Sequence, residues 1–301
     1  MIEYAISRLD NSSKIQKGDI YRYYGMSRQA FRKGVLKLEQ ERRMMELIAE
    51  EVSRHRNIKD RRAGSRTLYY NLEIGSRYSI GVSKFEELMS EYSLTLSVVK
   101  TRLITTRSTA LSRKYKDLIK GLIINNINQV IVGDLTYIYI DNRVYYLFSL
   151  FDYYSGRMVG CHGSDRMRKQ EAMEALEQFI RLRGVKRIQK TIHHTDGGSQ
   201  YFSHAYLKKG KMMEFSVAEN CLANGYAEQR NGLIKAHFLP LINGESLKSF
   251  QQGVQYIKDE YNNRRQEKLG WLSPIEFEEK WQKAPEEKRP KKQIYNYEES
   301  N

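Results

Sequence analysis

Cysteine is scarce in this sequence, and several other features are missing altogether. Only Cys161 and Cys221 occur among 301 residues, too few for a disulfide framework, so a reducing cytosol is the expected compartment. No apolar run approaches the roughly 20 residues that span a bilayer, and the opening "MIEYAISRLD" lacks the basic-then-apolar order of a signal peptide. These absences predict a cytoplasmic protein with no membrane partner.

Three classes of site are also disfavoured by what is missing. There is no Gly-x-x-x-x-Gly-Lys loop, so no ATP motor is indicated. His193, His194 and Cys221 lack the paired spacing of zinc ligands, and His194 is instead expected to brace the loop carrying Asp196. The 22 tyrosines suggest a tyrosine recombinase, but that class needs an Arg/His constellation in a helical domain, and the strand-rich second half argues against it.

Positive charge is abundant and unevenly placed. The formal net charge is +15, and the part before Asn128 has 25 Lys and Arg against 14 Asp and Glu, compared with 26 against 22 in the remainder. This excess favours a front half that binds a polyanion, and we expect double-stranded DNA. A basic surface that only maintains solubility is the alternative.

A helix-turn-helix is predicted between residues 14 and 56. Gly25 interrupts two segments with helical apolar spacing, and Ser27 is a good N-cap for the second. The opening "SRQAFRK" of that second helix would place Arg28, Gln29, Arg32 and Lys33 on its surface, and such side chains contact phosphates and base edges in a major groove. A plain helical hairpin with a solvated basic face remains the alternative.

A second helical part extends from Thr67 to Leu94, followed by a basic linker, "VVKTRLITTRSTALSRKYKD". The helical stretch "EQERRMMELIAEEV" in the first region could pair with another helix or pack on its own domain. We therefore expect a helix-turn-helix region over 1–60 and a helical region with its linker over 61–127.

The pattern changes at Gln129 from helices to strands. "QVIVGDLTYIYI" and "RVYYLFSLFD" predict a hairpin, and "MVGCHGS" a third strand. An amphipathic helix closed by Gly184, a fourth strand in "RIQKTIHHTDGG", a short helix, the short strand "EFSVA" and helices near 224–237 and 247–265 follow. This order predicts an α/β layer architecture over 128–281. The charged tail, 282–301, is expected to be flexible.

Carboxylates at two strands and one helix carry the candidate chemistry. Asp134 lies within the first strand, Asp196 just past the fourth, and Glu228 on a helix whose Lys235 is seven positions on and so shares its face. Three such carboxylates can hold two Mg²⁺ ions roughly 4 Å apart. Such a metal pair activates a water or a sugar 3′-hydroxyl for displacement at phosphorus.

These segments resemble one family closely. "VGDLTYIYIDNRVYYLFSLFDYYSGRMVG", "HHTDGGSQYFSHAYL" and "ENCLANGYAEQRNGLIKAHFL" are similar to the catalytic core of bacterial insertion-sequence transposases of the retroviral-integrase type, and "YNNRRQEKLGWLSPIEFEEKW" resembles the end of that core. The resemblance implies an RNase-H-like fold, with Asp134, Asp196 and Glu228 as catalytic metal ligands for two Mg²⁺ ions, or Mn²⁺. Lys235, Arg264 and Arg265 would then contact DNA.

The same resemblance implies partners and a place of action. Element ends and target DNA would be bound near the nucleoid by a homo-oligomer, with an upstream reading-frame product as a further partner or fusion, because the chain resembles the downstream frame. The sequence departs from the family in the 31 residues between Asp196 and Glu228, where thirty-five are usual, and in His237, where an acid is common. The alternative function is a catalytically inactive DNA-binding remnant.

Overall fold

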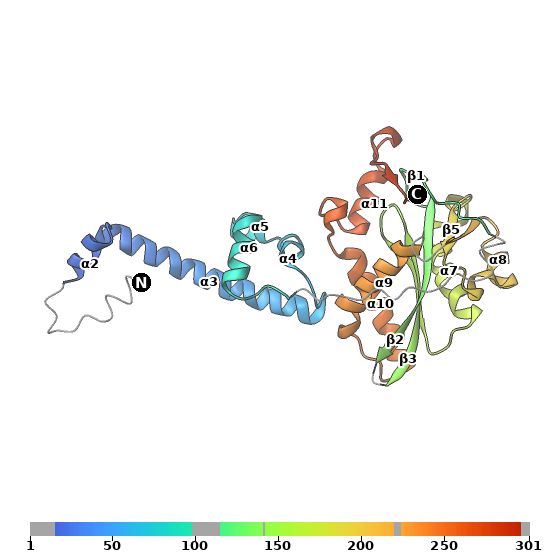
Figure 1. Cartoon of the computed structure of the whole chain (residues 1–301), viewed down its shortest axis with the longest axis horizontal. Helices are drawn as coiled ribbons and strands as arrows, with labels where there is room; N and C mark the ends of the chain where they lie inside the picture. The colour runs from blue at the N-terminus through green and yellow to red at the C-terminus, as the bar shows by residue number, and fades with distance from the viewer. Residues whose placement is uncertain (1–15, 98–114, 141, 220–223, 296–301) are drawn as a thin grey trace, which may run out of the picture.

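A computed structural model describes residues 16–97, 115–140, 142–219 and 224–295. Within these ranges, five helices precede a body built on a β-sheet (Figure 1). The predicted basic linker falls largely on residues 98–114, which lie outside the described residues. Within the described ranges, no helix is long and apolar enough to cross a membrane.

The first helices begin where the sequence predicts. Gly25 has a φ of 61°, and the Ser27 side chain accepts a hydrogen bond from the backbone N–H of Ala30, which caps the second of them. That second helix is 31 residues long and projects from the rest of the molecule as a rod (Figure 1). The helices of this part are α2 (Lys17–Tyr23), α3 (Arg28–Ile58), α4 (Ser65–Asn71), α5 (Ile74–Tyr78) and α6 (Val82–Glu91).

The hydrophobic core of the helical part crosses the domain boundary predicted at residue 60. Met45, Ile48 and Val52 of α3 are fully buried against the helices that follow. Their partners in this cluster are Ala63, Leu68, Ile74, Phe85, Leu88 and Met89. The stretch that could have paired with another helix therefore packs on its own domain, and a boundary at 60 would divide one core. The earlier half of α3 extends beyond this unit and contributes no buried residue to its core.

The sheet of the body has five strands in the order β4-β3-β2-β5-β6. Three strands are antiparallel, and the last two run parallel to β2. This arrangement confirms the predicted RNase-H-like mixed sheet. The strands are β2 (Val130–Ile140), β3 (Arg143–Asp152), β4 (Met158–Ser164), β5 (Ile192–Thr195) and β6 (Glu214–Val217).

Two hydrophobic clusters lie on opposite faces of this sheet, as period-2 alternation requires. Val132 and Ile138 of β2 face one cluster, whereas Ile131 faces the other. Helices α7 (Lys169–Arg183) and α8 (His204–Lys209) cover the Ile131 face, and the opposite face is covered by α9 (Gly225–His237), α10 (Leu247–Asn263) and α11 (Pro274–Gln282). Short 3-10 turns link them at Val185–Arg187, Ser199–Phe202, Leu239–Leu241, Glu267–Leu269 and Glu286–Lys288.

The prediction of a flexible tail over 282–301 is wrong for its described part. Strand β7 (Lys292–Gln293) pairs with β1 (Ile123–Ile124), and the side chain of Ile294 is fully buried. The Lys292 ammonium bonds the Tyr154 carbonyl oxygen. The buried isoleucine, the strand pairing and the Lys292 contact hold this segment on the body, although its composition is charged.

Candidate active site

Asp134 lies in the middle of β2, with its side chain on the face covered by α9. It is 9% exposed, so its carboxyl group needs a polar partner. The amide nitrogen of Asn231 on α9 donates to Asp134 Oδ2 at 2.7 Å. Ser149, opposite Asp134 on β3, donates to Asn231 Oδ1 at 2.9 Å. One strand and one helix thus hold this carboxylate in a fixed orientation.

Asp196 is brought to the same level of the sheet by strand register. Thr195, the last residue of β5, is paired with Gly133, the residue before Asp134. Asp196 follows at once in the turn, where the N–H of Gly198 donates to its Oδ1 at 3.0 Å. A Cβ on Gly133 would lie 3.0 Å from both the His193 ring and the Leu150 side chain, so glycine permits this close strand pairing.

Glu228 occupies the first turn of α9. Asn231 lies three positions later, which places both side chains toward the same face of the helix. Because Asn231 contacts Asp134, the helix delivers Glu228 to the side of β2 where Asp134 points. The three predicted carboxylates are therefore collected from β2, the end of β5 and the start of α9.

Burial raises the pKa of all three carboxyl groups, and the charge of Asp196 acts on the other two. Burial, with the negative charges of Asp196 and Glu228, raises the pKa of Asp134 to about 7. The pKa of Glu228 is raised by burial and by the charge of Asp196. Asp196 is exposed as a residue, yet protein atoms packed around its carboxyl group raise its pKa as well. Each carboxylate is less stable as an anion than in water, which is the condition a cation would relieve.

The carboxylates are not gathered into a closed metal site. Among the described residues, no three His, Cys, Asp or Glu side chains are placed together so that they could hold a metal ion. Asp134 Oδ2 is occupied by the Asn231 amide. The donor set still suits a hard divalent cation, because its atoms are carboxylate oxygens with raised pKa values.

Lys235 lies on α9, the helix that also carries Glu228. Burial lowers its pKa while the charge of Asp134 raises it, so the ammonium is within electrostatic range of that carboxylate. Its side chain is exposed. A cation at this position would meet a phosphate bound beside the carboxylates.

Sequence reasoning missed Asn231 and Ser149. The i+3 spacing from Glu228 would have indicated Asn231, since that spacing shares a helix face. Ser149 has no such signal, because its place opposite Asp134 depends on the strand register. His193 and His194 are instead engaged with Tyr206 at 2.7 Å and with Ser216 at 2.8 Å, consistent with a bracing role beneath Asp196.

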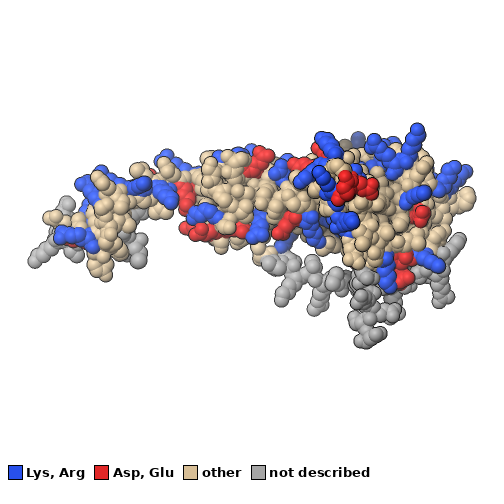
Figure 2. Space-filling model, turned by 90° about the horizontal axis from the view of Figure 1, so that it is seen from above, with Lys and Arg blue, Asp and Glu red and all other residues tan. Residues whose placement is uncertain are grey.

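The predicted DNA-contacting residues of the first region lie far along the rod from the carboxylates (Figure 1). They are exposed, and they comprise Arg28, Gln29, Arg32 and Lys33. In the space-filling view, Lys and Arg side chains gather at this end of the rod and again over the sheet-containing body (Figure 2). A single polyanion in contact with both would have to span the molecule.

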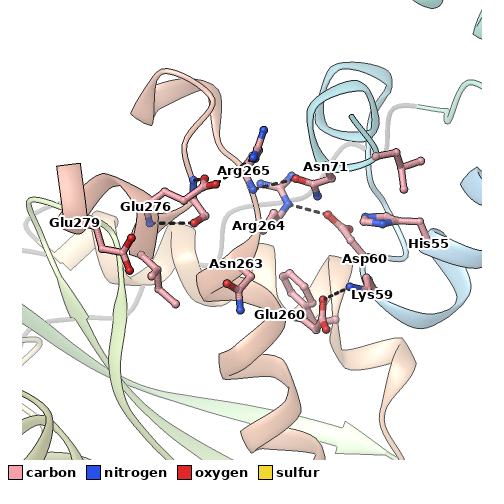
Figure 3. Close-up of a pocket in the computed structure, with 14 residues that line it drawn as sticks. His55, Lys59, Asp60, Asn71, Glu260, Asn263, Arg264, Arg265, Glu276 and Glu279 are labelled. Carbon is pink, nitrogen blue, oxygen red and sulfur yellow. Dashed lines mark hydrogen bonds and ion pairs between the residues drawn. The ribbon is translucent and has the colours of Figure 1, made fainter. Parts of the chain in front are cut away.

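Arg264 and Arg265 lie where the helical part meets the body, around a pocket of about 400 Å³ (Figure 3). Arg264 donates to Asp60 at 2.7 Å, and His237 at the end of α9 bonds the other Asp60 oxygen at 2.6 Å. Arg265 pairs with Glu276 at 3.0 Å. Both arginines therefore make protein contacts in this structure, whereas their predicted contact with DNA stays a prediction.

Comparison with known proteins finds a family match within the sheet-containing body. Residues 125–221 match the family model described as the integrase core domain. This part of the chain is similar to an integrase core. The match includes Asp134 and Asp196 and ends seven residues before Glu228.

Two curated relatives are similar to about half of the chain. The transposase for insertion sequence element IS629 of Shigella sonnei is 31% identical over 156 residues, covering 50% of this chain and 52% of that protein. Transposase InsF for insertion sequence IS3A of Escherichia coli K12 is 33% identical over 165 residues, covering 51% of this chain and 54% of that protein. The chain spans about half the length of the curated relatives it matches.

Solved structures also resemble the chain. The HTLV-2 integrase catalytic core domain in complex with magnesium (trimeric form) has a TM-score of 0.41 at 19% identity, covering 53% of this chain and 99% of that one. The simian T-cell lymphotropic virus intasome in complex with PP2A regulatory subunit B56 gamma has a TM-score of 0.45 at 16% identity, with coverage of 74% and 72%.

Proposed function

We propose that the chain is a DNA transposase that cleaves strands at insertion-sequence ends and joins them to target DNA, using Asp134, Asp196 and Glu228. The proposal is supported by the placement of Asp134 on β2, of Asp196 directly after β5, and of Glu228 on the helix that contacts Asp134 through Asn231. The two aspartates lie within the residues that match the integrase core domain. Similarity to two transposases over half the chain supports DNA transposition as the process.

The carboxylates would hold two Mg²⁺ ions, or Mn²⁺. Bound there, the metals would supply a nucleophilic water or 3′-hydroxyl and stabilise the leaving oxygen in an in-line displacement. Asn231, supported by Ser149, keeps Asp134 Oδ2 directed toward α9. Lys235 offers a cation for a phosphate next to the reacting one. Because the pKa of Asp134 is raised to about 7, binding of a cation there would be coupled to loss of its proton.

The substrates and partners follow from the same proposal. Element ends and target DNA would be held by the basic tip of the rod and by Lys235, at sites separated along the molecule (Figures 1 and 2). Two DNA ends have to be joined in one reaction, so a homo-oligomer on nucleoid DNA is expected, with an upstream-frame product as a further partner.

An inactive DNA-binding remnant is the second candidate. The absence of a closed three-ligand group among the described residues favours it, as does the short interval of 31 residues before Glu228. Helix α8 in this interval has only six residues before the turn into β6. A shortened connection of this kind would matter only if it held Glu228 away from the two aspartates.

Strand transfer distinguishes the two. Purified protein, an oligonucleotide ending in the element's 3′-hydroxyl and a supercoiled plasmid are incubated with Mg²⁺. We expect joined product with the wild-type protein and none with Asp196→Asn. The two proteins should bind the oligonucleotide with equal affinity. Wild-type protein that binds the oligonucleotide but yields no joined product with Mg²⁺ or Mn²⁺ would establish the remnant.

A further inference from the structure

The β2–β3 hairpin extends well past the end of β5. Strand β5 pairs with β2 only from Val130 to Gly133, whereas β2 continues to Ile140 alongside β3. From Leu135 onward, the β2 edge facing away from β3 has no neighbouring strand among the described residues. Asp196 lies where this open edge begins, so a bound strand could pass from the carboxylates to either face of the hairpin.

The two faces of the hairpin differ sharply. On the face covered by α10, Tyr145 donates to the Gly244 carbonyl oxygen at 2.7 Å, and Arg143 bonds that of Glu245. On the opposite face, Tyr137 is 45% exposed, Tyr139 72% and Val144 40%. Register places Tyr137 beside Tyr146 and Tyr139 beside Val144. Tyr146 is half-buried, whereas the other three side chains are exposed. Together they form one surface, which we call the tyrosine patch and define as Tyr137, Tyr139, Val144 and Tyr146.

Cationic and polar side chains continue from the tyrosine patch toward the Asp196 turn. The Tyr137 hydroxyl contacts the Met167 sulfur at 3.4 Å. An open hollow of about 380 Å³ begins there, lined by Met167, Arg168 and Lys169 on one side and by Ser199, Gln200 and Ser203 on the other. The exposed rings are thus joined to the catalytic turn by a path carrying two positive charges and several hydrogen-bonding groups.

We propose that the tyrosine patch is a stacking platform for unpaired nucleotides next to the reacting phosphate; this rests on the proposed function. Along β2, Tyr137 and Tyr139 are three and five positions from Asp134, or ~10 and ~17 Å at the rise of an extended strand, a span of a few nucleotides. Their odd spacing places the rings on the face opposite the Asp134 carboxylate, so a bound strand would reach them over the open edge of β2. Aromatic rings stack on any base, and cations beside them hold the backbone. Duplex DNA keeps its base faces covered, so the platform requires separated strands.

The test compares two DNA ends. One is fully paired, and the other carries three unpaired nucleotides beside the cleavage position; affinities are measured by fluorescence anisotropy in EDTA, with the full chain. Replacing both rings (Tyr137→Ala with Tyr139→Ala) should weaken binding of the unpaired end by about 10- to 100-fold and leave the paired end nearly unchanged. The Tyr137→Phe, Tyr139→Phe pair keeps both rings and should bind as wild type.

Two further variants make the test decisive. Tyr139→Ala alone removes the most exposed ring, so it should fold normally and lose part of the preference for the unpaired end. Tyr92→Ala, at a 37% exposed tyrosine on the helical part, should lose none. Equal affinities of wild type and the Ala variants for the unpaired end would overturn the proposal, as would Phe variants that bind as weakly as Ala.

Self-association provides the remaining outcome. If the Ala pair changes the sedimentation coefficient of the free protein and not its DNA affinity, the patch is a contact between copies and the proposal is wrong. The proposed function is judged separately by strand transfer. Suppose that Asp196→Asn abolishes strand transfer while the tyrosine variants bind the unpaired end as tightly as wild type. The proposed function would then stand, and only the stacking platform would be wrong.

Discussion

A carboxylate in the middle of an apolar strand is explained at Asp134 by its partners. The segment "QVIVGDLTYIYI" predicts a strand, and the resemblance of its surroundings to integrase-type cores marks this residue as a metal ligand. In the structure, burial and the charges of Asp196 and Glu228 raise its pKa to about 7, whereas the hydrogen bond from the Asn231 amide acts in the opposite direction. The acidic residues were predictable because each stands in a distinctive motif. Asn231 and Ser149 were not, because their contacts depend on tertiary packing.

The raised pKa of Asp134 predicts how stability depends on pH without metal. The folded state holds the proton up to about pH 7, whereas the unfolded chain releases it near pH 4, so this group's contribution falls as pH rises between these values. Asp134→Asn removes the buried charge. It should therefore raise the free energy of unfolding at pH 8 by a few kcal/mol, on the order of the pKa shift, and change it little at pH 4.

Urea unfolding in EDTA at both pH values checks this prediction. Asp165→Asn provides a matched control, because Asp165 is half exposed and lies outside the site. A stability difference between wild type and Asp134→Asn that is equal at pH 4 and pH 8 would show that Asp134 is not titrating near neutrality. Adding Mg²⁺ at pH 8 should stabilise wild type more than the variant, since only the native site binds the ion.

At the scale of elements, helices and strands were predictable from periodicity, whereas their cores were not. The Ser27 cap and the Gly25 turn occur as the sequence indicates. The apolar spacing did not show that the core of the helical part is shared by α3, α4, α5 and α6. Spacing marks the apolar face of each helix and not the face that it packs against. The exposed start of α3 remains the predicted DNA-contacting surface.

Charge removal at the start of α3 tests that prediction. Arg28→Ala with Arg32→Ala should weaken DNA binding and reduce the slope of log affinity against log salt by about 2, one for each lost phosphate contact. Arg42→Ala with Arg43→Ala removes the same charge two or more turns along the same helix and serves as the control. A salt slope that is unchanged in the first pair, or reduced equally in both, would contradict the assignment.

The docked tail makes a separate prediction about stability. Ile294 is fully buried against the body, so Ile294→Ala should lower the free energy of unfolding by about 2–4 kcal/mol. Val185→Ala, at a 49% exposed position, should cost less than about 0.5 kcal/mol. Equal melting temperatures for both variants would mean that the tail contributes no packing in solution.

At the scale of the whole molecule, the buried side chain of Asp60 makes contacts between the helical part and the sheet-containing body. Asp60 is 2% exposed and accepts a hydrogen bond from Arg264 (Figure 3). Asp60 also bonds His237, and the backbone N–H of Arg61 donates to the His237 carbonyl oxygen. His237 ends the helix that begins near Glu228, so the joint and the candidate site share α9. No local pattern could predict this, since Asp60 and Arg264 are 204 positions apart.

Loss of the joint should be measurable. Asp60→Ala leaves the Arg264 cation without its acid, and breaking a largely buried pair in this way costs about 3 kcal/mol. Hydrogen exchange should then speed up at the end of α9. Glu73→Ala removes a mostly exposed acid that pairs weakly with Arg265, at 4.0 Å. Hydrogen exchange at the end of α9 in this variant should therefore match wild type. Unchanged exchange in Asp60→Ala would show that the two parts are held by other contacts.

We propose that Asp134, Asp196 and Glu228 act together in cleavage of DNA strands. The most direct test incubates the purified chain with DNA flanking its own gene and Mg²⁺, and maps nicks at the element ends. We predict nicks with wild type, and none with Glu228→Gln at unchanged DNA affinity. Nicking that survives in Glu228→Gln, or DNA binding without any wild-type nick, would contradict the account.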